Sequence, residues 1–195
     1  MTTGLLLFAL VSVGCGGKDE KKDPAKPAAS TAPREQEERT ADGKIILRFD
    51  NNGDGVADVI KTMEEYPDPD DPAVTLRRTR KMEMDVNSDG KIDVIRDYDD
   101  AGKIKQESND TNLDGSIEMV AYYEKGKLVK KEHLDPKTGR IIDHRYYAND
   151  NLLRLESDTN NDDKIDYWEY YTEGRLERIG RDFNGDGRAD SWQKR

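Results

Sequence analysis

Apolar and polar residues alternate with a period of two along most of the chain after residue 42. The run at 164–171 is rich in β-branched and aromatic residues, and a second alternating run follows at 176–181. Alternation of this kind predicts β-strands. Both connections between runs are short, which favours antiparallel neighbours. The pattern therefore predicts an all-β fold, an antiparallel β-meander of hairpins, with at most one marginal helical turn at Arg34 to Arg39.

The hairpin pattern recurs, so residues 42–195 are interpreted as an array of six repeats of about 24 residues. From residue 110 onward the spacing is constant. Three columns of residues share a phase: Ile117, Ile141, Ile165 and Ala189; Val120, His144, Trp168 and Trp192; and Tyr122, Tyr146 and Tyr170, with Tyr98 in the same phase. A Pro-rich insertion at 67–72 interrupts the first copy. The loop beginning at Asp85 comes one residue early, which is consistent with a β-bulge.

Residues of equal phase fall on every second strand of one sheet face, roughly 10 Å apart. We therefore expect the Tyr column and the Val120–Trp192 column to pack with the intervening strands as the core. The alternative is an exposed aromatic stripe that stacks on sugars or on a protein partner.

Composition limits how such a sheet is stabilised, because hydrophobic residues make up 33% of the chain and charged residues 38%. Globular proteins average about 45–50% and about 25%. The chain therefore either stays disordered or needs something besides hydrophobic burial to offset its conformational entropy. The net charge of −10 argues against nucleic acid as a partner and favours cations. The sequence contains no nucleophile elbow, no metalloprotease helix and no phosphate-binding Gly-rich loop, so we expect no enzyme.

The candidate chemistry lies in five loops that share one nine-residue pattern: Asp-x-Asn-x-Asp, then Gly (Asp163 in one loop), with an acid at position 9. Ca²⁺ takes six to eight oxygen ligands, and the side chains at positions 1, 3 and 5 of a tight loop converge on one point. The carbonyl of position 7 and the acid at position 9 would complete the shell. We therefore expect about five Ca²⁺ sites, with these side-chain ligands: Asp50, Asn52, Asp54 and Asp58 in the first loop; Asp85, Asn87, Asp89 and Asp93 in the second; Asp110, Asn112, Asp114 and Glu118 in the third; Asp158, Asn160, Asp162 and Asp166 in the fourth; Asp182, Asn184, Asp186 and Asp190 in the fifth.

These loops differ from EF-hands, since position 12 is not a constant Glu and the flanking segments are predicted strands. They resemble the calcium-binding β-hairpin loops of FG-GAP repeats, as in integrin α-subunits. The resemblance implies ligands from positions 1, 3, 5 and 9 with the carbonyl of position 7; it covers the loops alone and does not extend to the propeller fold. The remaining copy, here called the sixth, lies at 134–142 between the third and fourth loops. It keeps Gly139 but has Leu134, Pro136, Thr138 and Ile142 at the ligand positions, so we expect it to hold no calcium.

The N-terminus carries a short apolar run, Leu5 to Val11, followed by small residues that lead into the sole cysteine, Cys15. The run fits the apolar segment of a secretory signal. With its small residues it resembles the lipobox of bacterial lipoproteins, which implies acylation of Cys15 and anchoring at the outer membrane; an ordinary cleaved signal is the alternative. We expect a signal peptide at 1–14, the lipidated cysteine and a disordered tether at 15–41, and the calcium-loop domain at 42–195.

Together these features predict an exported, lipid-anchored calcium-binding protein with a structural or binding role at the cell surface or in the periplasm. One alternative is a module that binds a polysaccharide or a protein through an exposed Tyr/Trp face, with calcium only structural. Another is a largely disordered acidic chain that collects calcium.

Overall fold

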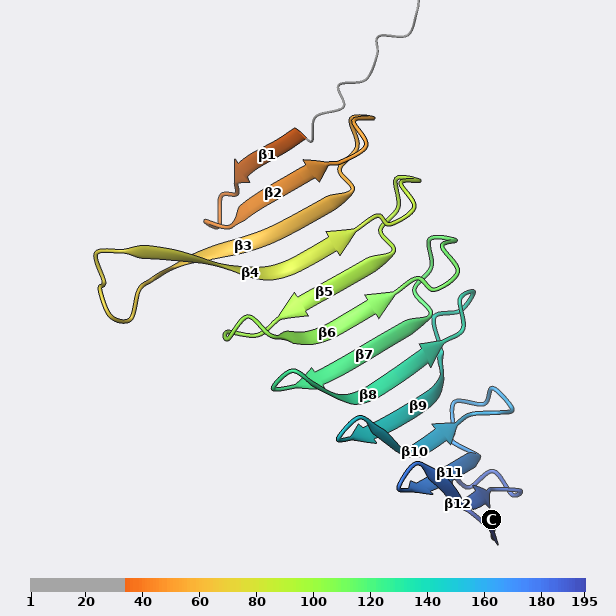
Figure 1. Ribbon diagram of the computed structural model, residues 1–195. Coiled ribbons are helices and arrows are strands. Elements are labelled where there is room, and N and C mark those ends of the chain that lie inside the picture. The colour runs from red at the N-terminus through yellow and green to blue at the C-terminus, as the bar shows by residue number, and fades with distance from the viewer. Residues whose placement is uncertain (1–33) are drawn as a thin grey trace, which may run out of the picture.

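The computed structural model describes residues 34–195, which form one antiparallel sheet of 13 strands in sequence order (Figure 1). The all-β meander is thus confirmed, and the described residues are not a disordered chain. None of them forms a helix long and apolar enough to cross a membrane. The strands are β1 (Arg34–Arg39), β2 (Ile45–Asp50), β3 (Val59–Pro67), β4 (Thr75–Met84), β5 (Val94–Tyr98), β6 (Ile104–Asn109), β7 (Met119–Glu124), β8 (Lys127–Leu134), β9 (Ile141–Ala148), β10 (Asn151–Ser157), β11 (Tyr167–Thr172), β12 (Arg175–Arg181) and β13 (Ser191–Lys194).

Strand β1 corrects the expectation for Arg34–Arg39, which had been placed in the tether with at most a helical turn. All six residues pair with β2 in antiparallel register. Charged side chains hold this edge strand, since Glu38 pairs with Arg48, and Arg39 pairs with Glu65 of β3. The folded sheet therefore begins at least eight residues before the predicted boundary at residue 42.

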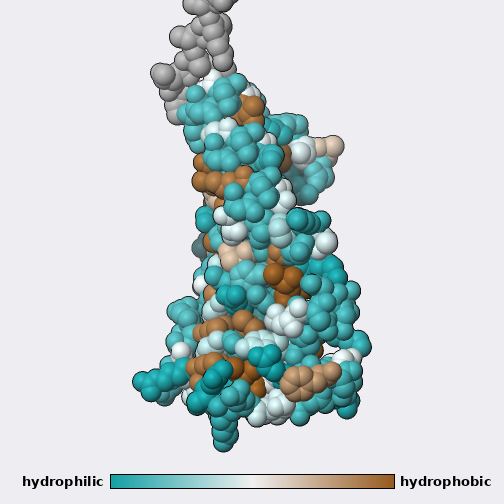
Figure 2. Space-filling view, turned by 90° about the vertical axis from the view of Figure 1, so that its right-hand side faces the viewer, coloured by the Kyte–Doolittle hydropathy of each residue, from teal (hydrophilic) through white to brown (hydrophobic). Residues whose placement is uncertain are grey.

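The sheet is a single layer, and this corrects the prediction of an aromatic core. Among the described residues the buried hydrophobic side chains are Ile45, Ala121 and Ile179. The predicted core columns are half-buried, and Trp192 is 47% exposed. In Figure 2 the apolar residues form separate patches interrupted by hydrophilic ones. Because no second layer within residues 34–195 covers either face, cross-strand pairs carry much of the packing.

One of these cross-strand rows alternates tyrosines with basic residues. Tyr122, Lys130, Tyr146, Arg154, Tyr170 and Arg178 stand side by side on successive strands. The Lys130 ammonium lies 4.4 Å from the Tyr122 ring, Arg154 lies 4.2 Å from Tyr146, and Arg178 lies 4.4 Å from Tyr170. Cation–π contacts of this kind contribute about 0.5–1 kcal/mol each at exposed sites.

Tyr98 does not belong to this row, contrary to its phase in the sequence. Asp97 pairs with Gln106, which pairs with Tyr122, so Asp97 takes the structural place that Tyr98 was expected to hold. The one additional residue between the second and third loops therefore lies in the turn 99–103 between β5 and β6, so a turn residue rather than a bulge accounts for the early start of the loop at Asp85. The bulge that is present, between Asp97 and Tyr98, recurs between Tyr122 and Tyr123 in the next hairpin.

Two kinds of connection alternate along the chain. Tight turns such as Lys125-Gly126 and Glu173-Gly174 have positive φ at both residues, which is the geometry of a type I′ hairpin turn. Asn149-Asp150 has the same geometry. The Asp-x-Asn-x-Asp loops form the other kind of connection. All of them lie at the opposite ends of the strands from these tight turns, so they follow one edge of the sheet that runs across the strands (Figure 1).

Candidate metal centres

The five acidic loops connect β2–β3, β4–β5, β6–β7, β10–β11 and β12–β13, so they stand in a row along one edge. Their contacts show that successive loops touch. The Ser88 hydroxyl of the second loop donates to Asp58 Oδ1 of the first at 2.8 Å. The Lys91 ammonium of the second loop donates to the Asp114 carbonyl of the third at 2.7 Å. All five loops therefore share one edge of the meander, because every second connection of an antiparallel meander lies at the same strand ends.

The carboxylate at position 1 lies inside each loop and accepts backbone N–H groups. Asp50 accepts from Gly53 at 2.6 Å and from Gly55 at 3.0 Å. Asp110 accepts from Leu113 and Gly115 in the same way. Burial raises the pKa of Asp110, but the N–H groups of Gly115, Leu113 and Asp114 outweigh it, so the pKa falls below its usual range. The N–H groups of its own loop therefore hold Asp110 as a carboxylate.

The carboxylate at position 9 closes the loop from the other side. Asp58 accepts the N–H of Asn51 at 2.6 Å, and Asp93 accepts that of Val86 at 2.6 Å. The remaining loops repeat the contact through Glu118, Asp166 and Asp190. The Asn51 N–H and the Ser88 hydroxyl lower the pKa of Asp58. The carboxylates at positions 1 and 9 thus both accept backbone N–H groups of their own loop.

Positions 3 and 5 are tied together by the Asn side chain. In the first loop, Asn52 Oδ1 accepts the N–H of Asp54 at 2.8 Å, and Asn52 Nδ2 donates to Asp54 Oδ2 and Asp58 Oδ1 at 3.0 and 3.3 Å. In each of the five loops this amide nitrogen donates to the carboxylate of position 5 or 9. The NH₂ group therefore stands between carboxylates, where a cation would also be attracted.

Left-handed backbone at two positions makes these loops tight. Position 6 has positive φ in every loop, and Asp163, the one residue there that is not glycine, has φ 68°. Position 4 is left-handed too, which the sequence analysis missed, and it includes Leu113 at φ 62°. A Leu in this region is strained by about 1–2 kcal/mol, so the hydrogen bonds of the third loop must offset that strain.

The third loop brings carboxylates closest together. Oxygens of Asp110, Asp114 and Glu118 lie within 4.8 Å of one another, and within residues 34–195 this is the acidic group that meets that spacing. In each of the other four loops the predicted ligand residues lie in one loop, but three of their acidic oxygens do not come within 4.8 Å of one another. The five loops therefore differ in how closely their acidic oxygens approach one another, and the third loop brings them closest.

Asp93 in the second loop carries an unsatisfied oxygen. The side chain is 1% exposed, and Oδ1 has no hydrogen-bond partner within the described residues. In the first loop the corresponding oxygen, Oδ1 of Asp58, accepts from Asn52 and Ser88. The third loop has Leu113 at the position that Ser88 holds in the second loop, so it has no hydroxyl there that could donate to Asp93. A buried carboxylate oxygen left unpaired is costly unless a cation compensates it.

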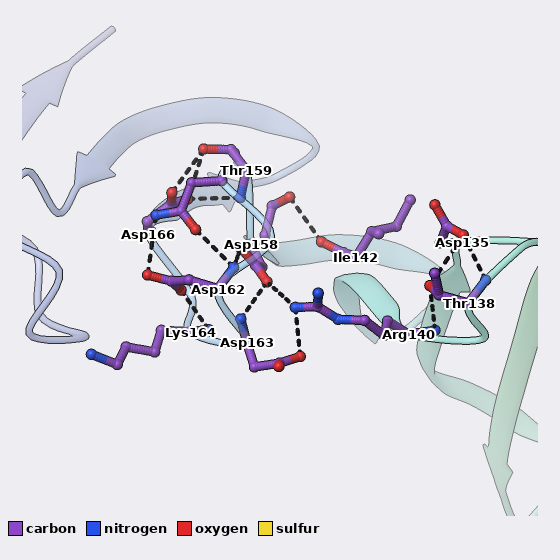
Figure 3. A network of polar contacts seen from close by, with 12 residues as sticks. Asp135, Thr138, Arg140, Ile142, Asp158, Thr159, Asp162, Asp163, Lys164 and Asp166 are labelled. Carbon is purple, nitrogen blue, oxygen red and sulfur yellow. Dashed lines mark hydrogen bonds and ion pairs between the residues drawn. The ribbon is translucent and has the colours of Figure 1, made fainter.

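The connection at 134–142 between β8 and β9, which is in phase with the acidic loops, is a plain turn. Asp135 closes it by accepting N–H groups from Thr138 and Lys137, and these bonds lower the pKa of Asp135. Its side chains at the ligand positions are those of Leu134, Pro136, Thr138 and Ile142. The turn presents Arg140 to the fourth loop, where the guanidinium lies 2.6 Å from Asp163 Oδ1 and 3.4 Å from Asp158 Oδ2 (Figure 3). Nothing in the loop pattern predicted this contact.

Cys15 and the predicted signal peptide lie outside the residues that the structure describes. Neither a protein-family model nor a curated protein sequence matches the chain. Among solved structures, the chain is similar to part of the accessory secretory proteins 1, 2 and 3 of Streptococcus pneumoniae, with 13% identity and a TM-score of 0.36 over 64% of this chain and 19% of that one. It is also similar to part of a mutant of Staphylococcus aureus TarM in complex with fondaparinux, α-GlcNAc-glycerol and UDP, with 12% identity and a TM-score of 0.37 over 61% and 21%. The chain thus spans about a fifth of each of these proteins.

Proposed function

We propose that this chain is an exported, lipid-anchored calcium-binding protein whose sheet, read as six hairpin repeats, is stabilised by Ca²⁺ in its acidic loops. The observation that carries the proposal is the buried, unpaired Oδ1 of Asp93 in a loop that already holds Asp85 and Asp89. A divalent cation would supply the positive charge that this carboxylate oxygen lacks as a partner. Because the loops repeat one pattern, the same chemistry extends along the row.

Calcium is favoured over other metals by the donors, which are carboxylate, amide and carbonyl oxygens. Hard cations bind such oxygens, and Ca²⁺ accepts six to eight of them in flexible geometry, whereas thiolates and imidazoles would favour zinc or copper. In the proposed site, positions 1, 3, 5 and 9 and the carbonyl of position 7 hold the ion. The position-3 amide would turn so that its oxygen, rather than its nitrogen, faces the cation.

The proposed role of calcium is structural. A single-layer sheet with few buried apolar side chains gains little from hydrophobic burial, and the like charges in each loop repel one another. If calcium binds the folded loops and not the unfolded chain, its binding free energy adds directly to the stability of the fold. The row of ions would leave both sheet faces free for a structural or binding role in the periplasm or at the cell surface.

Calorimetric titration of the metal-free chain with calcium tests this proposal. We expect binding of several ions per chain, with dissociation constants of about 10⁻⁴ to 10⁻³ M, as in extracellular modules. Magnesium, which requires stricter octahedral geometry, should bind more weakly. A titration with no heat of binding and no bound calcium at millimolar concentration would contradict the proposal.

The anchor is tested separately. If Cys15 is acylated, Cys15→Ala should move the protein from the membrane fraction to the soluble fraction of cells, because a lipid chain rather than the polar sheet holds it there. The measurement is an immunoblot of the fractions, with Ser30→Ala as the matched control, because it keeps the thiol and lies outside the lipobox-like run. Unchanged membrane partition of Cys15→Ala would refute the lipoprotein proposal while leaving calcium binding untouched.

A second candidate function is binding of a polysaccharide or a protein on the Tyr/Trp face. Trp192 on the terminal strand is 47% exposed, and its ring lies 5.6 Å from that of Tyr170. Arg178 stacks near both rings, at 4.4 and 4.7 Å. Such a face could stack on a sugar ring; quenching of Trp fluorescence by added glycans, lost in Trp192→Ala, would distinguish this function.

A further inference from the structure

The residue at position 7 of several loops reaches toward the next loop in the row. Lys91 donates to the Asp114 carbonyl of the third loop, and Lys164 donates to the Gly185 carbonyl of the fifth, each at 2.7 Å. These ammonium groups meet backbone oxygens at positions 5 and 4, which are not predicted ligands. In both cases the cation braces the neighbouring loop without contacting its ligand carboxylates.

Arg140 occupies position 7 of the ligand-free turn and behaves differently. Its guanidinium contacts two carboxylates of the fourth loop: Asp158 at position 1 and Asp163 at position 6. Asp158 is 7% exposed, so the charge that Arg140 meets is largely removed from water. Asp163 stands where the other four loops have glycine, and it supplies the closer contact of 2.6 Å. The fourth loop thus carries an extra carboxylate together with its own cation.

The turn fixes Arg140 in this place. Asp135 accepts N–H groups from Lys137 and Thr138, the Asp135 N–H donates to the Arg140 carbonyl, and the Gly139 N–H donates to the Asp135 carbonyl. Four short hydrogen bonds therefore hold the backbone from which the guanidinium extends. This turn lacks the acidic residues of the other loops, but it is closed and places a positive charge beside the fourth loop.

We propose that Arg140 is a tethered cation that competes with calcium for the fourth loop, so that this loop fills at higher calcium than the others. The inference rests on the proposed function. A calcium ion coordinated by Asp158 would lie close to the guanidinium, and the two positive charges repel. Calcium must therefore displace Arg140 or bind against that repulsion. Without calcium, Arg140 holds the fourth loop closed.

The test follows each loop by its own backbone amide signals in NMR spectra of the ¹⁵N-labelled full-length chain during a calcium titration. In the wild type, amides of the fourth loop, such as that of Lys164, should shift at about tenfold higher calcium than those of the second and fifth loops, which corresponds to about 1.4 kcal/mol. Arg140→Gln should bring the fourth loop into the range of the others. Asp163→Gly should do the same, since it removes the closer partner of Arg140 and restores the common residue.

Arg175→Gln is the matched control, because Arg175 is an exposed arginine beside the Glu173-Gly174 turn, at the strand ends opposite to the acidic loops, and forms no ion pair within residues 34–195. It should leave all midpoints unchanged. Signals of the other loops report in every variant that the sheet is folded. If the fourth loop titrates with the others in the wild type, or if its midpoint is unmoved in Arg140→Gln, the inference is wrong. If no loop responds to calcium in any variant, the proposed function itself has failed.

Discussion

Asp93→Asn is expected to change the stability of the chain in opposite directions with and without calcium. In millimolar calcium the variant loses a charged ligand of the second loop, so it should be less stable than the wild type by about 2–3 kcal/mol. In chelator it should be at least as stable as the wild type. The amide oxygen can still accept the N–H groups of Val86 and Asn87, while the buried charge with its unpaired oxygen is gone.

Thermal unfolding followed by circular dichroism under both conditions gives the comparison. Asp190→Asn is the matched control, since Asp190 holds position 9 of the fifth loop but is exposed, and its Oδ1 accepts from Asn184 at 3.0 Å. This control should lose stability in calcium and show no gain in chelator. If Asp93→Asn loses the same stability in both conditions, Asp93 is a structural capping residue, and the observation that carries the calcium proposal is explained without a metal.

The loops could be predicted from the sequence because their geometry is local. An Asp that accepts N–H groups from residues three to five positions later needs only the nine residues of its own loop. The contacts of Asp50 with Gly53 and Gly55 are of this kind. The placement of all five loops on one edge followed from the short connections, which allow only antiparallel neighbours. Both predictions depended on spacing and not on the packing of distant residues.

The core could not be predicted in the same way, because a period of two does not say whether a second layer covers the sheet. The Tyr column was assigned to a core, but on a single layer the same residues stack beside Lys130, Arg154 and Arg178. The mixed charge of Arg34–Arg39 likewise predicted a solvated tether. These six residues form a strand because the edge of β2 offers backbone hydrogen bonds and side-chain partners such as Arg48.

The contact between Arg140 and the fourth loop depends on both kinds of information. That Asp163 departs from glycine is visible in the sequence, and so is the loss of ligands in the sixth copy. What brings the two together is the pairing of β9 with β10, which places position 7 of one copy beside the next loop. Contacts between successive loops are therefore the part of the site that requires the structure.

If calcium in the loops holds the single-layer sheet together, the melting temperature of the full chain should differ strongly between calcium and chelator. If calcium is twentyfold above a dissociation constant of about 10⁻⁴ M, each occupied loop adds about 2 kcal/mol. For a chain of this size, 1 kcal/mol shifts the melting temperature by about 2–4 °C. Several emptied loops should therefore lower it by about 20 °C.

Sodium chloride at matched ionic strength is the control, because it screens the net charge of −10 without occupying the loops. We expect it to recover only a small part of the stability that the chelator removes. Magnesium at the same concentration should recover less than calcium does. We expect a melting temperature about 20 °C lower in chelator, restored by calcium and not by sodium chloride; equal melting temperatures in calcium and in chelator would show that calcium does not stabilise the sheet.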